Sequence, residues 1–410
     1  MLITRTIGAA ATVATLFAAA LAVTMPGADP AEADHGAAPT PVTPTAAAGH
    51  TRMGLPVPTT ATVTAAELGP DSVVAVVTRG TLEDRDADGL GRSLEVITPD
   101  GVRHPVYSVD LEEGPPDVFP GDFLIADWRP ETHTALLRVL TGGDRDRLVS
   151  YDVTTGAMHQ VTAPQRGGFF ALDPDGSGVL MTSYGSARRP GRVSTLDWDG
   201  TRTRLPARSD GSAITSTDGR TLVTAAAATW WVTDLAAGTS VSVDVGRSCV
   251  PRRWLDADSV VATCSGTRSS QLRAVDLDGS SVGLGVRHTE KTRTTGPLIL
   301  NDGDVREVQG RSWYESFDGC GGGFLTRQTA AGKVRMVRVP GVRGPLTLVG
   351  TRGDDLVLTH EKPECDDTRQ RSVLSLFDPV TKAETVLTRL ARDEAWREAI
   401  AATEVRSWIW

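Results

Sequence analysis

One short sequence unit recurs seven times along this 410-residue chain, and it constrains the fold more than any other feature. Each copy has an apolar strand, a polar or acidic residue near its end, a tight turn and a second strand; only the last copy lacks a Gly in its turn. The copies begin at Leu94, Leu148, Val193, Trp230, Leu272, Phe324 and Val373. They follow one another at intervals of roughly 45 residues, which is typical of a repeated four-stranded unit.

Two further short strands precede most copies, as in FFALDPDGSGVLMTS before the third and AITSTDGRTLVTAA before the fourth. One such unit cannot bury both of its faces, whereas seven units in a ring bury every face except the two rims. The 42 Gly and 24 Pro residues also disfavour a mainly helical protein. We therefore predict an all-β, seven-bladed β-propeller with four-stranded antiparallel blades and a short C-terminal helix. A pair of β-sandwiches is the alternative, because its strands recur at similar intervals.

Composition divides the chain into four regions. An apolar run from Ile7 to Val23 follows Arg5 and precedes Ala31-Glu32-Ala33, which is the pattern of a secretory signal peptide and its cleavage site. An uncleaved signal anchor is the alternative. The predicted regions are a signal peptide (1–33), an Ala/Pro/Thr-rich linker (34–58), the propeller (59–388), and a C-terminal helix and tail (389–410). A secreted or extracytoplasmic protein of the cell envelope is expected, without stable membrane insertion once the signal is removed.

The predicted helix lies in the segment ARDEAWREAIAATEV, where the repeat pattern ends. In a helix, Trp396, Ala399, Ile400 and Thr403 would share one face, and most of the charged residues would lie elsewhere. This pattern predicts a short amphipathic helix that packs on the ring.

The repeats STDGRTLVTAA and DPDGSGVLMTS, with their Asp-Gly turns, resemble those of secreted TolB-like and WD-repeat-like propellers of an actinobacterial exported type. The resemblance covers about 60–387. It implies a propeller that binds a protein or a ligand in an extracytoplasmic space. It transfers no catalytic residue, since the shared positions are turn and core residues.

Four Cys in an exported chain predict two disulfides. Cys249 and Cys264 are placed symmetrically about the turn at Asp256-Ala257, so an antiparallel hairpin would put them opposite each other. Cys320 and Cys365 then form the second predicted pair, in loops of neighbouring blades. A zinc site is the rival interpretation, but the chain has no C-x-x-C spacing.

The segment from Asp84 to Glu95 fits the calcium-loop pattern D-x-D-x-D-G-x5-E, with Asp84, Asp86, Asp88 and Glu95 as candidate ligands. Alternate carboxylates in such a loop converge on one hard cation. The flanking segments are strand-like rather than helical, unlike those of an EF-hand, and the alternative is a solvated acidic loop. Calcium is the one cofactor that the sequence suggests.

The loops between the second and third strands of each blade should emerge on one rim of the ring. On blades 6 and 7 these loops are acidic, with the candidate residues Glu315, Asp318, Glu361, Glu364, Asp366 and Asp367. Ring closure would place them beside the acidic loop of blade 1, opposite a basic sector around blade 3. Such a rim is predicted to bind Ca²⁺ or a cationic partner; a rim that only keeps the protein soluble is the alternative.

These features favour a non-enzymatic, monomeric, exported propeller that binds a protein or a small ligand on one rim. A secreted hydrolase or lyase acting on glycans is the alternative, and it would need paired carboxylates in the central funnel. The net charge of −9 argues against nucleic acid as the main partner.

Overall fold

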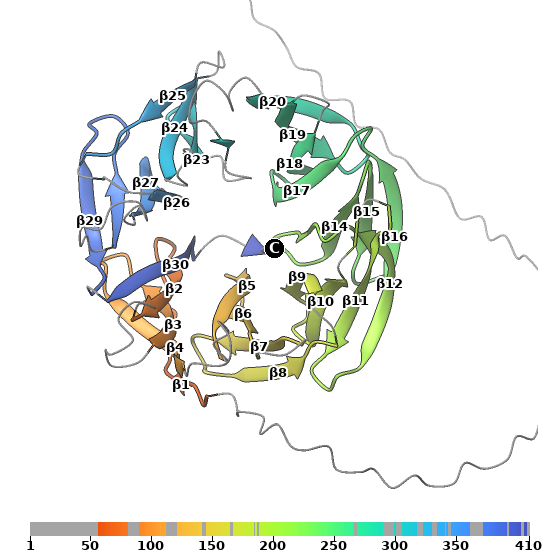
Figure 1. Cartoon of the computed structure of the whole chain (residues 1–410), viewed down its shortest axis with the longest axis horizontal. Helices are drawn as coiled ribbons and strands as arrows, with labels where there is room; N and C mark the ends of the chain where they lie inside the picture. Colours follow the sequence, from red (N-terminus) through yellow and green to blue (C-terminus); the bar gives the residue numbers. More distant parts are fainter. Residues whose placement is uncertain are drawn as a thin grey trace, which may run out of the picture. The chain divides into compact units, whose positions relative to one another are not determined.

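A computed structural model describes residues 56–80, 90–111, 121–141, 145–164, 167–183, 185–186, 188–265, 269–289, 299–300, 306–317, 323–329, 334–340, 342, 346–360, 372–391, 393–402 and 406–407. The strands of these residues form seven antiparallel sheets arranged around a central axis (Figure 1). The predicted all-β, seven-bladed propeller is therefore confirmed, and the sandwich alternative is excluded.

The blades are numbered in chain order, and the strands of each blade are given below in their order from the centre outward. Blade 1 contains β30 (Glu394–Ala401), β2 (Val73–Arg79), β3 (Leu90–Ile97), β4 (Arg103–Leu111) and β1 (Thr59–Thr60). Blade 2 contains β31 (Arg406–Ser407), β5 (Phe123–Arg129), β6 (Thr134–Val139), β7 (Arg147–Asp152) and β8 (Met158–Thr162). Blade 3 contains β9 (Gly167–Leu172), β10 (Gly178–Ser183), β11 (Gly191–Asp197) and β12 (Arg202–Ser209). Blade 4 contains β13 (Ala213–Thr215), β14 (Thr221–Ala226), β15 (Thr229–Asp234) and β16 (Thr239–Asp244).

The remaining three blades follow the same order. Blade 5 contains β17 (Cys249–Trp254), β18 (Ser259–Ser265), β19 (Ser269–Asp276) and β20 (Ser281–Thr289). In blade 6, β21 (Ile299–Leu300) and β22 (Arg306–Val308) both pair with β23 (Arg311–Phe317), followed by β24 (Gly323–Thr329) and β25 (Val334–Val337). Blade 7 contains β26 (Leu346–Arg352), β27 (Asp355–His360), β28 (Val373–Phe377) and β29 (Glu384–Arg389). Each hairpin of the sequence repeat is the outer strand pair of one blade.

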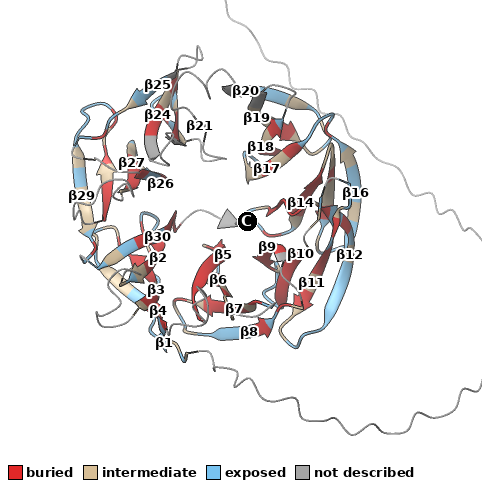
Figure 2. Ribbon diagram, viewed as in Figure 1, coloured by how far each residue is buried: buried red, intermediate tan, exposed pale blue. Residues whose placement is uncertain are grey.

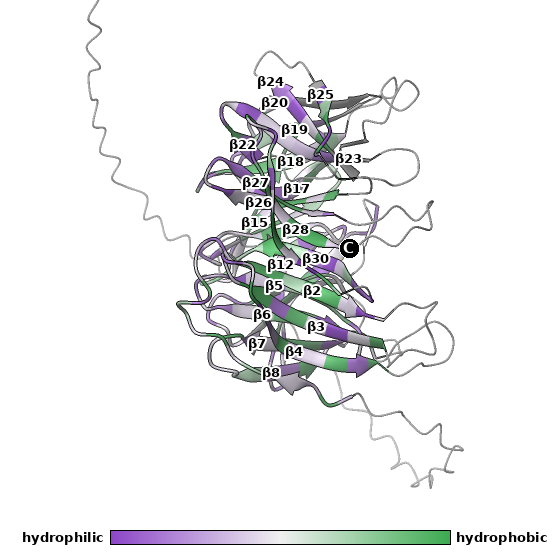
Figure 3. Cartoon of the chain, turned by 90° about the vertical axis from the view of Figure 1, so that its left-hand side faces the viewer, coloured by the Kyte–Doolittle hydropathy of each residue, from purple (hydrophilic) through white to green (hydrophobic). Residues whose placement is uncertain are grey.

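Burial decreases from the centre of the ring to its outside (Figure 2). The inner strands lie between two neighbouring blades, so both of their faces are covered and the sequence is continuously apolar. Strand β2, with the sequence VVAVVTR, is an example, and it is green in the hydropathy view of Figure 3. The outermost strands β8, β12 and β16 are mostly exposed and polar. The hydrophobic core is therefore a set of apolar layers between successive blades.

The predicted C-terminal helix is wrong, because its residues form the strand β30. This strand pairs with β2 along its whole length and becomes the innermost strand of blade 1. A bulge opposite Val76 and Val77 skips Arg397, so Trp396 and Ala399 face the same side although they are three residues apart. Ile400 faces the other side, toward the core shared with blade 2. The bulge thus gives a strand the three- and four-residue apolar spacing of a helix.

Strands from the two ends of the described chain close the ring. Strand β30 pairs with β2, and β31 pairs with the inner edge of β5 at the centre of the ring (Figure 1). Glu398 also links blades 1 and 2, since its Oε2 accepts the backbone N–H of Ile125 at 3.0 Å. No helix among the described residues could span a membrane.

The predicted disulfide between Cys249 and Cys264 is confirmed. The two residues are direct partners in the β17–β18 register, with their Cα atoms 4.0 Å apart. A disulfide is typical of proteins that fold in an oxidising, extracytoplasmic compartment. Cys320 and Cys365 lie outside the described residues, so their pairing stays a prediction.

We expect the purified protein to contain no free thiol, because the two Cys outside the described residues are predicted to pair with each other. Thiol labelling of the denatured, unreduced protein measures this directly, and labelling after reduction gives the control value of four sites. Two or more labels per unreduced chain would contradict the second disulfide.

Candidate functional site

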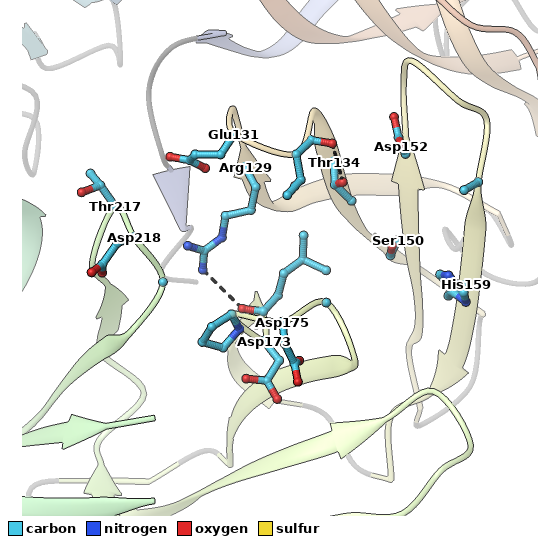
Figure 4. A pocket seen from close by; sticks show the side chains of 16 residues that line it. Arg129, Glu131, Thr134, Ser150, Asp152, His159, Asp173, Asp175, Thr217 and Asp218 are labelled. Carbon is cyan, nitrogen blue, oxygen red and sulfur yellow. Dashed lines mark hydrogen bonds between the residues drawn. The ribbon is translucent and has the colours of Figure 1, made fainter. Parts of the chain in front are cut away.

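A cavity of about 350 Å³ opens at the β5–β6 turn of blade 2, the β9–β10 turn of blade 3 and the β13–β14 turn of blade 4 (Figure 4). We call this side of the ring the A–B rim; the loops between second and third strands emerge on the opposite side, the B–C rim. The ionisable residues that line the cavity are Arg129, Glu131, Asp152, His159, Asp173, Asp175 and Asp218. Five carboxyl groups therefore surround one arginine.

Arg129 is buried and its guanidinium is already neutralised. Its Nε donates to Oδ2 of Asp127 at 2.8 Å, and both side chains are almost fully covered. Its remaining donors reach Oγ1 of Thr215 at 2.9 Å and the carbonyl oxygens of Leu172 and Ser216 at 3.3 and 3.4 Å. Because these partners come from blades 3 and 4, Arg129 ties three blades together, and its charge is balanced by Asp127.

Three of the carboxylates are held by their own turns. Asp175 accepts the backbone N–H of Ser177, and Asp218 accepts the hydroxyl of Ser216. These hydrogen bonds lower the pKa of both carboxyl groups. Burial raises the pKa of Asp152, but hydrogen bonds from the two threonines that follow it outweigh this effect and lower the pKa. The three groups therefore stay ionised at neutral pH.

Asp173 differs from them, because its pKa is raised to about 6. Burial is the largest cause, and the negative charges of Asp175 and Asp197 add to it, while Arg129 opposes it. Within the described part of the chain, Asp173 makes hydrogen bonds through its backbone: its N–H donates to Gly178 and its carbonyl accepts from Gly176. Its carboxyl group is thus half-buried among like charges.

The matching turn of blade 4, between β13 and β14, has a serine at this position. Ser216 makes the same two backbone hydrogen bonds as Asp173, with Thr221 and Gly219. Its hydroxyl donates to Asp218 at 2.6 Å. The hairpin turn between β3 and β4 of blade 1 has the same backbone hydrogen bonds, and there the Thr98 hydroxyl donates to Asp100. At Asp173 a carboxyl group therefore replaces the hydroxyl donor of these two turns, and the negative charge of Asp175 adds to the rise in its pKa. Asp197 and Asp276 hold the same turn position in the outer hairpins of blades 3 and 5.

Glu131 and His159 complete the cavity wall. Glu131 is exposed in the turn between β5 and β6, and Figure 4 shows it beside Arg129. His159 on β8 stacks on the ring of Trp198 with centroids 5.7 Å apart. With Arg129 balanced by Asp127, the cavity carries an excess of negative charge.

Only one of the four candidate calcium ligands lies in the described residues. Glu95 is 2% exposed on β3, and its two oxygens accept from Arg103 at 2.7 and 2.8 Å. Arg103 also donates to Glu394 at 2.6 and 3.0 Å. Burial lowers the pKa of Arg103, but its hydrogen bonds to Glu95 and Glu394 outweigh this effect and raise the pKa. Asp84, Asp86 and Asp88 lie outside the described residues, so the calcium site stays a prediction.

This ion-pair network lines a second cavity, of about 530 Å³, at the B–C rim of blade 1. Its other pair joins Arg79 to Asp110. The acids of this cavity are therefore matched by arginines, in contrast to those of the cavity on the A–B rim.

Of the predicted acidic rim, only Glu315 lies in the described part of the chain. It is 5% exposed on β23, where its Oε2 accepts the backbone N–H of Leu348 on blade 7 at 3.4 Å. Glu315 thus lies between two blades. Asp318, Glu361, Glu364, Asp366 and Asp367 are outside the described residues. Among the residues that are described, no three His, Cys, Asp or Glu side chains gather as a metal site.

Sequence reasoning missed the cavity on the A–B rim. The signal was present in the turns, since the D-P-D-G of blade 3 replaces the S-T-D-G of blade 4 at matching positions of the repeat. What the repeat could not show is that turns of blades 2, 3 and 4 surround one cavity.

No protein-family model matches the chain, and no curated protein matches its sequence. Solved structures with a similar fold include oligopeptidase B from Leishmania major (10% identity, TM-score 0.45, covering 77% of this chain and 48% of that one). They also include a putative TolB from Agrobacterium tumefaciens (14%, TM-score 0.36, covering 57% and 85%) and virginiamycin B lyase from Staphylococcus aureus (12%, TM-score 0.40, covering 74% and 96%). The chain spans about half the length of the oligopeptidase. At these identities and scores the likenesses do not bear on activity.

Proposed function

We propose that this propeller is a non-enzymatic binding protein that takes a small cationic ligand in the cavity of blades 2, 3 and 4. The observation that carries the proposal is the half-buried carboxyl of Asp173, whose pKa is raised to about 6 among like charges. Buried groups that raise one another's energy are typical of binding sites, where a ligand relieves the strain.

The cavity has the size and charge that such a ligand needs. Its volume of about 350 Å³ is in the range of small-molecule sites. Within the described part of the chain, the carboxyl groups of Asp173 and Glu131 accept no hydrogen bond, whereas Asp152, Asp175 and Asp218 belong to their turns. An ammonium or guanidinium group would lie near Asp173, and the remaining acids would add long-range attraction.

Glycan hydrolysis is the second candidate function. Two neighbouring carboxyl groups with separated pKa values are typical of an acid–base pair, and the pKa of Asp173 is raised while that of Asp175 is lowered. The Asp175 carboxylate is nevertheless engaged in a hydrogen bond within its own turn, since it accepts the backbone N–H of Ser177 at 2.8 Å. We therefore rank binding above hydrolysis, and release of reducing ends from oligosaccharides would reverse this order.

The proposal includes export of the protein, with 1–33 as its signal peptide and a monomeric ring as the mature form. The disulfide between Cys249 and Cys264 supports an oxidising compartment.

Amine ligands are expected to bind more tightly at pH 8 than at pH 5, by roughly tenfold, because Asp173 ionises as the pH rises through about 6. Calorimetric titration with a panel of amines and guanidines, each paired with a neutral alcohol of similar size, measures this. The control variant Asp110→Asn removes one negative charge at the other cavity and should leave the affinity unchanged. Equal binding of amines and alcohols, or equal affinity at both pH values, contradicts the proposal.

A further inference from the structure

The two outer strands of blade 3 carry four exposed arginines. Arg192 lies on β11, and Arg202, Arg204 and Arg208 lie on β12. Figure 2 shows β12 as an exposed strand on the outside of the ring. We call these four residues the arginine band.

Strand pairing places the four side chains on one face of the blade. The register pairs are Arg192 with Arg208, Ser194 with Arg204, and Leu196 with Arg202. Paired residues share a face, as do residues two apart along β11. In agreement, Nε of Arg202 donates to Oγ of Ser194 at 2.9 Å. Since Leu196 packs in the core shared with blade 2, the band faces the blade 2 side at the outer edge of that core.

The arginines of the band form no ion pairs with described residues. Among pairs of described residues, no carboxylate oxygen lies within 4.0 Å of these four guanidinium groups. Burial and the charges of Arg204 and Arg192 lower the pKa of Arg202. The nearby Arg188 and Arg189 are exposed as well and extend the basic surface toward the B–C rim. Repulsion of this kind favours an anionic partner that would relieve it.

The charge of the band is opposite to the net charge of the chain. The whole protein has a net charge of −9, so the band is a basic area on an acidic protein. The neighbouring outer strand β8, with the sequence MHQVT, contributes no acid. Charge complementarity therefore favours an anionic partner at this outer edge of the ring.

We propose that the arginine band binds a linear phosphodiester polymer without bases, of the poly(glycerol phosphate) type. Guanidinium groups match phosphate oxygens with two parallel hydrogen bonds. Arg202 and Arg204 are two residues apart on one strand, about 7 Å along it, which is similar to the separation of neighbouring phosphates in an extended chain of glycerol phosphate. Strands β11 and β12 contain no aromatic residue, and the nearby rings of Trp198 and His159 are stacked on each other. The band therefore offers guanidinium groups for a phosphate backbone and no ring on the two strands for base stacking.

The test compares two triple variants of the full chain that change the net charge equally. The band variant is Arg192→Gln/Arg204→Gln/Arg208→Gln. The control is Arg247→Gln/Arg338→Gln/Arg389→Gln, whose three arginines are exposed on other parts of the ring. Labelled poly(glycerol phosphate) is titrated into each protein at several salt concentrations, and thermal unfolding confirms that each is folded.

The parent and the control variant are expected to bind with the same affinity and salt dependence. The band variant should bind at least tenfold more weakly, with a salt slope lower by roughly 2, because three phosphate contacts are lost. A similar loss in both variants would show a bulk charge effect and overturn the proposal. So would equal binding of poly-glutamate or of single-stranded oligothymidine, or a dimer of the parent that dissociates in the band variant. Arg204→Gln alone serves as a second, milder variant.

Discussion

Ile400→Ala is expected to lower the free energy of unfolding by about 2–5 kcal/mol, the cost of removing a large buried aliphatic group. Ile400 is 0% exposed on β30, where it pairs with Val74 and packs in the core between blades 1 and 2. The effect should be large because β30 closes the ring, and no other strand of the described chain pairs with the inner edge of β2. Denaturant unfolding followed by tryptophan fluorescence measures it.

The matched control is Val241→Ala on the outermost strand of blade 4. Val241 is 66% exposed, so its truncation should change the unfolding free energy by less than about 0.5 kcal/mol. A free-energy loss at Ile400 as small as that at Val241 would contradict the assignment of β30 as the closing strand.

The fold was predictable because its signal is local and repeated. Each copy of the hairpin, such as the one that begins at Val193, contains its own alternation and turn residues, and seven copies reinforce one another. The register of Cys249 with Cys264 followed from the same local symmetry. The C-terminal strand was not predictable in this way, since its partner β2 is more than 300 residues away and its bulge at Arg397 imitates a helical period.

The candidate site was less predictable for a related reason. The alternation of carboxylates from Asp84 to Glu95 is a pattern along the chain, whereas the partner of Glu95 is Arg103 on the next strand. Asp173 lacks a motif of its own. It becomes distinctive only when its surroundings raise its pKa and when its turn is compared with that of Ser216. A site that depends on burial and on turns from three blades can be recognised only from the structure.

Asp173→Ser is expected to raise the stability of the protein at pH 7 while it abolishes binding of amine ligands. The serine would restore the hydrogen bond that Ser216 makes with Asp218 in the matching turn, and it would remove one of the two neighbouring carboxyl groups. Such an opposition of stability and binding is typical of functional residues, whereas a purely structural residue would lose stability on replacement. The amine titration and the unfolding measurement must therefore change in opposite directions.

The pH dependence of stability tests the same variant more sharply. A carboxyl group whose pKa rises on folding, here from 3.8 to about 6, binds its proton more tightly in the folded state. This tighter proton binding adds to the stability of the folded state below about pH 4, and the added stability is lost as the pH rises through 6. The stability advantage of Asp173→Ser should therefore grow between pH 4 and pH 7, to the order of 1–3 kcal/mol. The reciprocal variant Ser216→Asp should show the opposite change, because it sets a second carboxyl beside Asp218. A constant difference between Asp173→Ser and the parent across this range would mean that the Asp173 carboxyl is not strained, and the binding proposal would lose its basis.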